Sequence, residues 1–286
     1  MNSRYLDRLL KFGISLVFFG VISLRDGLMS LLGHPMPRGC VVLYYHSVAK
    51  QHRELFAQQM DLILRCAKLI SATQEEPCGP GERYVAITFD DGLESVLENA
   101  LPEMESRKIP STMFIVVQSL GDFPCWIPDG PRSDATQKVM SIEQLRHLSS
   151  DLVTVGSHTL THPNLRRVDQ AQARREISDS RAELQRILNM DVSLFSFPYG
   201  EFNSRLIQLC RDAGYERVFT TLPILAFCGP DEFVSGRVTV EPTDWPIEFR
   251  LKILGAYRWL PLAIALKRKL RSSFSAAMRS RIQDEL

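Results

Sequence analysis

Hydrophobic positions from residue 40 onward fall into two alternating kinds of segment. Short runs rich in β-branched and aromatic residues predict buried strands, and longer segments with apolar residues three or four positions apart predict helices. The expected strands are 40–45, 84–89, 112–117, 152–155, 193–197, 217–221 and 234–240, and the expected helices lie near 53–69, 93–107, 141–149, 169–189, 202–213 and 246–258. This alternation predicts an α/β fold built on a parallel sheet or barrel.

The N-terminal segment, residues 1–38, follows a different pattern. Phe12–Leu24 holds no charged residue, three basic residues precede it, and the pair Arg25-Asp26 follows it at once. This apolar run is shorter than the roughly 20 residues that span a bilayer, and no small-residue cleavage site follows it. We expect a helix lying in the membrane interface. An uncleaved spanning anchor and a soluble helix packed on the domain stay open as alternatives.

The C-terminal segment, residues 259–286, combines aliphatic residues with lysine and arginine, which predicts a basic amphipathic helix. A solvated terminal helix is the alternative to contact with an anionic membrane surface. No linker divides the chain between the two terminal segments. We therefore expect three parts: a membrane-associating segment at 1–38, one domain at 39–258 and a terminal helix at 259–286.

The composition gives little information about binding partners, but the cysteine usage bears on the cellular compartment. The formal net charge of the 286 residues is +1, which gives no reason to expect nucleic acid as a partner. Six cysteines lie far apart and form no CxxC pair, so neither a zinc ribbon nor a disulfide framework is predicted. This cysteine usage favours a reducing compartment. We expect a peripheral or monotopic membrane protein and favour the cytoplasmic face over the external one.

Two adjacent carboxylates follow the expected strand 84–89. Asp90 and Asp91 stand at its carboxyl end, where α/β sheets and barrels place their active sites. Gly92 lets the chain turn sharply after them. The pair can divide two roles, one carboxylate binding a cation and the other acting near a substrate. Taken alone, the same residues are also compatible with a simple turn and a helix cap.

Two histidines four residues apart follow another short apolar strand. Pro163 makes a helix through His162 unfavourable, so His158 and His162 are expected in a compact loop. Two imidazoles and one carboxylate form the three-ligand set that leaves a position open on a catalytic divalent metal. We expect zinc first, with other divalent ions as alternatives.

Three sequence motifs occur in one order: TFDDG at 88–92, SHTLTHPNL at 157–165 and FPYG at 197–200. They resemble the polysaccharide deacetylases of carbohydrate esterase family four, the NodB-homology family, and the resemblance covers roughly residues 40–240. It implies a distorted (β/α) barrel of about seven parallel strands. It also implies metal-dependent hydrolysis of N-acetyl groups, less often O-acetyl groups, on an acetylated glycan or glycolipid.

The resemblance assigns a role to each matching position. Asp90 corresponds to the catalytic base, Asp91 to the carboxylate metal ligand, and His158 and His162 to the imidazole ligands. The backbone amide of Tyr199 would help to stabilise the oxyanion. The supporting residues that it implies are Thr159, which braces the histidine loop, and Pro198 and Gly200, which flank Tyr199.

The chain departs from the family pattern at two places. Ser196 stands where the third motif usually has an arginine that pairs with the base, and no histidine follows His162 to act as the acid. The segment VVLYYHSV at 41–48 resembles the Tyr-His strand that opens an exopolysaccharide-associated subgroup, and this implies His46 as the general acid. The alternative for His46 is a structural role at a strand end.

Three further residues are expected near the site on weaker grounds. Arg237 is the candidate to replace the missing arginine, because the same subgroup often has an arginine entering its last strand. Trp126 and Trp245 are candidates to line the acetyl or sugar pocket.

Two rival functions stay open. One is a hydrolase of the same fold that acts on another C–N bond, such as a cyclic amide. The other is an inactive metal-binding scaffold in a polysaccharide assembly complex, although retention of both Asp90 and His46 argues against it.

Overall fold

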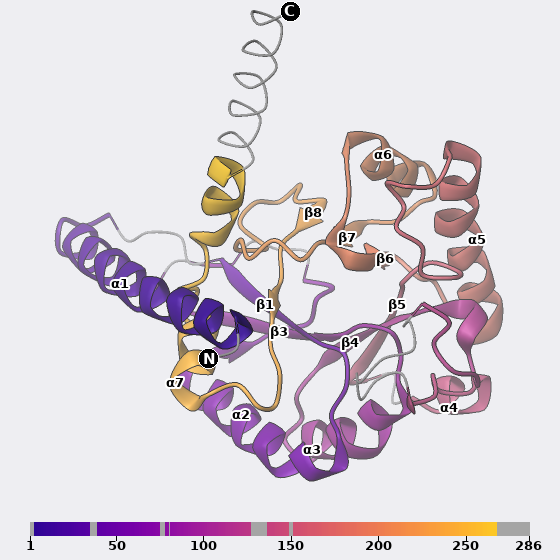
Figure 1. Ribbon diagram of the computed structural model, residues 1–286, viewed down its shortest axis with the longest axis horizontal. Coiled ribbons are helices and arrows are strands. Elements are labelled where there is room, and N and C mark those ends of the chain that lie inside the picture. Colours follow the sequence, from indigo (N-terminus) through magenta and orange to yellow (C-terminus); the bar gives the residue numbers. More distant parts are fainter. Residues whose placement is uncertain are drawn as a thin grey trace, which may run out of the picture.

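The computed structural model describes residues 3–34, 39–74, 78–79, 81–126, 136–148 and 151–267 (Figure 1). Its helices are α1 (Ser3–Leu31), α2 (Arg53–Cys66), α3 (Leu101–Glu105), α4 (Ile142–Arg146), α5 (Gln170–Leu188), α6 (Ser204–Asp212) and α7 (Pro246–Ile253). Its strands are β1 (Cys40–Tyr45), β2 (Lys68–Leu69), β3 (Tyr84–Phe89), β4 (Ser111–Ile115), β5 (Val153–Ser157), β6 (Leu194–Ser196), β7 (Arg217–Phe219), β8 (Val234–Ser235) and β9 (Val238–Thr239).

The strands form one curled sheet in the order β8-β7-β6-β5-β4-β3-β1-β9, with β2 paired to β3. Each of these strand pairs is parallel. The two end strands, β8 and β9, are separated by only two residues in the chain, so the sheet curls back toward its start. Helices surround it on the outside (Figure 1). The prediction of a distorted (β/α) barrel of parallel strands is confirmed.

Buried side chains fill both faces of the curled sheet. Alternate residues of a strand point to opposite faces, so Val42 and Ala86 join Phe114 and Phe219 in one cluster. Their sequence neighbours Leu43 and Ile87 belong to the larger cluster, which packs the strands against the helices. Apolar side chains thus fill the barrel below its carboxyl-terminal edge, where the polar residues of the candidate site lie.

Several elements differ from the sequence-based expectation. The expected helix 53–69 ends at Cys66, and Lys68–Leu69 forms β2. The expected strand 234–240 is divided into β8 and β9, because the Arg237 N–H donates to the Leu222 carbonyl at 2.9 Å instead of continuing a strand pairing. The expected helix 93–107 contains a π-helical turn at Val96–Ala100 immediately before α3. Pro102 has no N–H to donate, which weakens regular helix pairing at that point.

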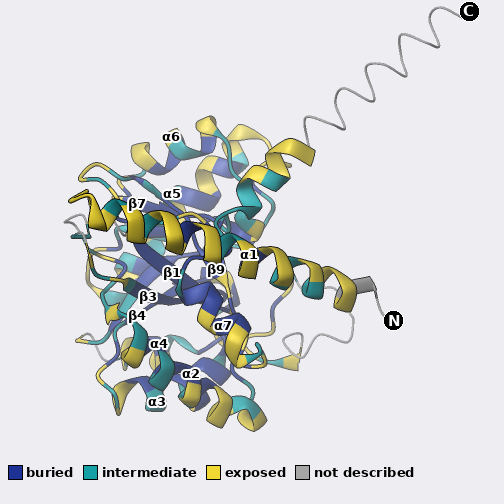
Figure 2. Cartoon of the chain, turned by 90° about the vertical axis from the view of Figure 1, so that its left-hand side faces the viewer, coloured by how far each residue is buried: buried dark blue, intermediate teal, exposed yellow. Residues whose placement is uncertain are grey.

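Helix α1 runs through Arg25-Asp26 without a break and lies beside α7 (Figure 2). Within the described residues it is the one helix that is long and apolar enough to cross a membrane by length and composition. Residues 260–267 begin the expected C-terminal helix. The remainder of that helix, 268–286, lies outside the described residues.

Candidate active site

Polar residues from several strands meet at the carboxyl-terminal edge of the barrel. Tyr45 pairs with Phe89 in register, and the Asp90 N–H donates to the Tyr45 carbonyl at 2.9 Å. The next residues of the two strands, His46 and Asp90, therefore leave the sheet side by side. His158 follows β5 at the same edge, since parallel strands end there together.

Asp91, His158 and His162 bring three ligand atoms within 4.8 Å of one another. The Nε2 atoms of His158 and His162 lie 3.7 and 3.5 Å from Asp91 Oδ1, and all three residues are buried. Asp91 adopts a left-handed backbone at φ 71°, and Gly92 follows at φ 68°. The positive φ at Gly92 favours glycine in this turn, and a Cβ there would also lie 2.8 Å from Ile115 Cδ1.

The two histidines are held in the form that a metal ion requires. The Nδ1 of His158 lies 2.8 Å from the Ser196 carbonyl, and a donor at Nδ1 leaves the Nε2 lone pair facing Asp91 and His162. Burial, followed by the neighbouring His158, lowers the pKa of His162 to about 2, so its ring is neutral near pH 7. Neutral imidazoles and one carboxylate suit zinc or a similar divalent ion.

The histidine loop is non-helical, as Pro163 predicted. Thr159 and His162 have positive φ angles of 74° and 61°, a conformation that non-glycine residues adopt at a cost. The His162 N–H donates to the Thr159 hydroxyl at 3.0 Å. This is the bracing contact that we expected of Thr159.

A carboxylate that sequence reasoning missed holds the same loop from below. Glu176 of α5 is buried, and its Oε2 accepts the N–H groups of Leu160 and Thr161 at 2.9 Å each. Its Oε1 accepts the Thr161 hydroxyl at 2.6 Å. The available sequence signal is an acidic residue between Ala173 and Ser180, on the buried stripe of an amphipathic helix.

We expect Glu176→Gln to weaken metal binding about 10- to 100-fold, which is the range for residues that support metal ligands. The amide presents an NH₂ group to donors that now meet a carboxylate oxygen, so the loop loses part of its fixed shape. Competition against a chelating dye measures the affinity. Glu183→Gln, an exposed change on the same helix, should leave the affinity unchanged. Equal affinities in the two variants would contradict a positioning role for Glu176.

Arg237 surrounds the other carboxylate of the pair. Its Nη1 and Nη2 donate to the two oxygens of Asp90 at 2.7 and 2.8 Å, while Nη2 also reaches the Ser196 hydroxyl at 2.7 Å. Further contacts run to the Thr88 hydroxyl at 3.1 Å and to the Thr220 carbonyl at 3.3 Å. The guanidinium of Arg237, which lies between β8 and β9, thus binds the expected base, Asp90. It also contacts Ser196, which stands where the family usually has an arginine.

Burial and nearby positive charge have opposite effects on the pKa of the Asp90 carboxyl. Burial would raise this pKa, but the charge and hydrogen bonds of Arg237, together with His158 and His46, outweigh burial and hold the pKa well below its usual range. Arg237 is completely buried, and its guanidinium lies 4.6 Å from the ring centre of Tyr44 and 5.3 Å from that of Phe114. Asp90 is therefore ionised near pH 7, with both oxygens fixed in position.

His46 lies at the exposed rim above this pair. Residues 44 and 46 share one face of β1, and the His46 ring meets the Tyr44 ring edge to face at 5.6 Å. Residues 88 and 90 share the matching face of β3, where Arg237 binds both. His46 and Asp90 therefore border the same polar space.

The remaining expected residues divide between two places. Tyr199 and Trp126 place their rings 4.8 and 4.7 Å from the His162 ring, which they flank. Pro198 is buried and precedes Tyr199, whose φ is 60°. A Cβ on Gly200 would lie 1.9 Å from the Thr221 hydroxyl oxygen, so the turn needs glycine there as well. Trp245 does not line the site, because its ring packs against Tyr5 and Phe12 of α1.

Several proteins with similar sequences are named as deacetylases. The sequence model described as polysaccharide deacetylase matches residues 79–218. YxkH of Bacillus subtilis strain 168, named as a polysaccharide deacetylase, is 24% identical over 163 residues, 57% of this chain and 53% of YxkH. The peptidoglycan-N-acetylmuramic acid deacetylase PdaC of that strain is 26% identical over 140 residues, 49% of this chain and 26% of PdaC.

Among solved structures, IcaB from Ammonifex degensii superimposes with a TM-score of 0.62 and 26% sequence identity, covering 77% of this chain and 97% of that one. By contrast, the aligned segments span about half the length of YxkH and about a quarter of PdaC. These similarities extend well beyond the three short motifs.

Proposed function

Because this chain belongs to the polysaccharide deacetylase family, we propose that it hydrolyses the acetamide of N-acetylated sugars in a polysaccharide or lipid-linked glycan. The observation that carries this proposal is the division of the adjacent carboxylates. Asp91 lies with two buried histidines, and Asp90 lies with Arg237. One carboxylate is thus available as a ligand and the other as a base. We also propose that the chain has three parts: a membrane-associating segment at 1–38, the catalytic domain at 39–258 and a terminal helix at 259–286.

The donor set fits a divalent ion, and zinc is the ion that we propose. Asp91, His158 and His162 would hold it, with the His158 tautomer fixed by the Ser196 carbonyl. When bound, such an ion supplies a Lewis acid that polarises the acetyl carbonyl and acidifies water. Three protein ligands leave room for both groups.

The protein's own groups move the protons. Asp90 accepts a proton from the attacking water, and Arg237 keeps its carboxylate ionised and oriented. The backbone amide of Tyr199 donates to the developing oxyanion. His46 protonates the leaving nitrogen, so that acetate and a free amino sugar result rather than an amine anion. Trp126 and Tyr199 border the space in which the sugar would lie.

We place this activity at a membrane surface, on the cytoplasmic face. The support is the exposed apolar surface of α1 and the basic sequence of the C-terminal segment. A glycan or glycolipid under construction would be the substrate at such a surface. Ester hydrolysis on O-acetylated sugars, cleavage of a cyclic amide and a scaffold without activity are the competing functions.

Acetate release tests the proposal. We expect the purified zinc-loaded protein to release acetate from N-acetylglucosamine oligomers or extracted glycolipids, and a chelator to abolish the release until zinc is restored. Asp90→Asn should be inactive while it still binds zinc. Release from O-acetylated sugars alone would favour the esterase. If a metal-loaded protein released nothing from any acetylated glycan, the scaffold would be favoured.

The same assay tests His46. We expect His46→Gln to lower kcat about 10²- to 10⁴-fold with little change in KM, because general-acid catalysis contributes about that much. An activated substrate with a good leaving group should lose much less, since it needs no proton at nitrogen. His52→Gln provides the control, because His52 lies in the turn before α2. Full activity of His46→Gln on the sugar amide would disprove the acid assignment.

A further inference from the structure

Helix α1 has its polar contacts and its bare aliphatic surface on opposite sides. Arg8, Ser15 and Ile22 face the domain, and Ser15 is fully buried. The opposite side carries aliphatic residues that are between 59 and 87% exposed; they are three or four positions apart from Val17 onward, and the first lies seven positions before Val17. This aliphatic stripe consists of Leu10, Val17, Val21, Leu24, Leu28 and Leu31. A surface helix of a soluble domain shows the reverse arrangement.

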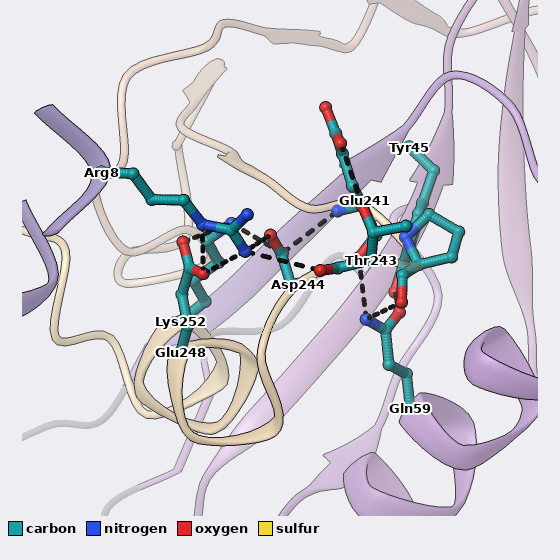
Figure 3. A network of polar contacts seen from close by, with 9 residues as sticks. Arg8, Tyr45, Gln59, Glu241, Thr243, Asp244, Glu248 and Lys252 are labelled. Carbon is teal, nitrogen blue, oxygen red and sulfur yellow. Dashed lines mark hydrogen bonds and ion pairs between the residues drawn. The ribbon is translucent and has the colours of Figure 1, made fainter. Parts of the chain in front are cut away.

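Specific contacts hold α1 lengthwise on the domain. The Arg8 Nε donates to Glu248 Oε2 at 2.8 Å, and its guanidinium lies 3.6 Å from Asp244 Oδ1 (Figure 3). About two turns further along the helix, the Ser15 hydroxyl accepts the indole N–H of Trp259 at 2.9 Å. Phe12, between these two points, and Phe19, one turn beyond Ser15, pack against Leu251 and neighbouring residues.

These contacts distinguish two ways of meeting a bilayer. A 29-residue helix is about 44 Å long, more than a hydrocarbon core requires. If α1 crossed the bilayer, lipid would have to surround the stretch between Arg8 and Ile22, and the contacts with Glu248 and Trp259 would be lost. If α1 lies in the plane of the interface, these contacts persist and only the aliphatic stripe enters the lipid.

We propose that α1 is an in-plane membrane-docking helix whose aliphatic stripe enters the acyl layer of a phospholipid bilayer while its other side stays bound to the barrel. The stripe has no charged, polar or aromatic member, which fits lipid better than a second copy of the chain. Leu262 and Leu266 are also exposed on the helix that begins at Leu260, beside Phe12 and Phe19.

This docking would bring a groove that reaches Arg237 close to the membrane surface. A groove of about 630 Å³ lies between α1 and the barrel edge, with Arg8 and Lys11 on one wall and Thr221 and Arg237 on another. The inference about a membrane-retained glycan as substrate rests on the proposed deacetylation. The docking itself does not, because it can be measured without any substrate.

Vesicle binding tests the stripe. With vesicles of phosphatidylethanolamine and phosphatidylglycerol, we expect Val17→Asp/Leu24→Asp to lose at least tenfold in affinity, because two charges would enter the acyl layer. Leu55→Asp/Met190→Asp places the same charges at exposed apolar positions elsewhere and should bind as the unaltered protein does. Equal binding by the two double variants would overturn the proposal. Failure of the unaltered protein to bind vesicles at all, with Val17→Asp/Leu24→Asp dissociating a dimer, would assign the stripe to a second copy.

Measurements of depth in the bilayer distinguish an α1 that lies in the membrane interface from an α1 that spans the membrane. Single tryptophans at Leu10, Val17 and Leu24 should be quenched alike by lipids brominated near the headgroup, after subtraction of the unaltered protein's signal. Quenching of Val17→Trp mainly by lipids brominated near the methyl end would show a spanning helix and overturn the proposal. A protein that binds vesicles in this way but releases no acetate would disprove deacetylation and leave docking intact.

Discussion

Substitution of His158 by alanine is expected to lower kcat/KM at least 10³-fold, a loss of roughly 4 kcal/mol in transition-state stabilisation. Zinc affinity should fall in parallel, because His158 contributes one of three closely grouped ligand atoms. The Ser196 carbonyl also fixes the orientation of the His158 ring, so a neighbouring side chain cannot replace this ring as a ligand. Acetate release and zinc content should be measured on the same preparation.

The control for this substitution is His147→Ala, which removes an exposed histidine whose Nδ1 lies 2.6 Å from the Glu143 carbonyl of its own helix. We expect its zinc content and acetate release to equal those of the unaltered protein. Retention of acetate release by metal-free His158→Ala would contradict the metal-dependent proposal as a whole.

The second large effect is on stability. We expect Arg237→Met to lower the free energy of unfolding by about 3–5 kcal/mol, because it leaves the buried Asp90 carboxylate without its partner. Ser196 and Thr88 lose a donor at the same time. Urea unfolding measures the loss, and acetate release should fall with it because the base is no longer oriented.

A paired substitution makes this prediction specific. Asp90→Asn removes the buried charge, so the double variant Asp90→Asn/Arg237→Met should be destabilised by less than the sum of the two single changes. Arg166→Met breaks an exposed ion pair with Glu201 and should cost no more than about 1 kcal/mol. Strict additivity of the two buried substitutions would mean that the ion pair does not stabilise the fold.

The sequence predicted the central strands and the grouping of Asp91 with His158 and His162 for physical reasons. Long apolar runs such as 40–45 and 84–89 have few ways to be buried other than as central parallel strands, and their carboxyl ends meet at one edge. Residues directly after such strands, among them Asp90 and Asp91, could therefore be placed together before the structure was known. The positions of β8 and β9 could not be predicted, because strands of two residues leave no periodicity to detect.

Long-range partners were the harder part of the site. The pairing of Arg237 with Asp90 spans 147 residues, and the family resemblance, rather than any local pattern, singled out this arginine. Glu176 was not recognised, because a single acidic residue on a helix usually faces solvent. Trp245 was a candidate to line the acetyl or sugar pocket, but its ring packs against α1.

The bond between Arg237 and Asp90 also has a consequence for biosynthesis. At about 5–20 residues per second, a ribosome completes Arg237 roughly 7–30 s after Asp90. During this interval β3 can associate with β1, but the carboxylate that follows β3 has no cation to balance it. Stable enclosure of Asp90 must therefore wait for the chain that leads from β8 into β9. A nascent chain stopped before Arg237 should be a substrate for chaperones and proteases. The ion pair that orients the base therefore also distinguishes completed chains from truncated ones.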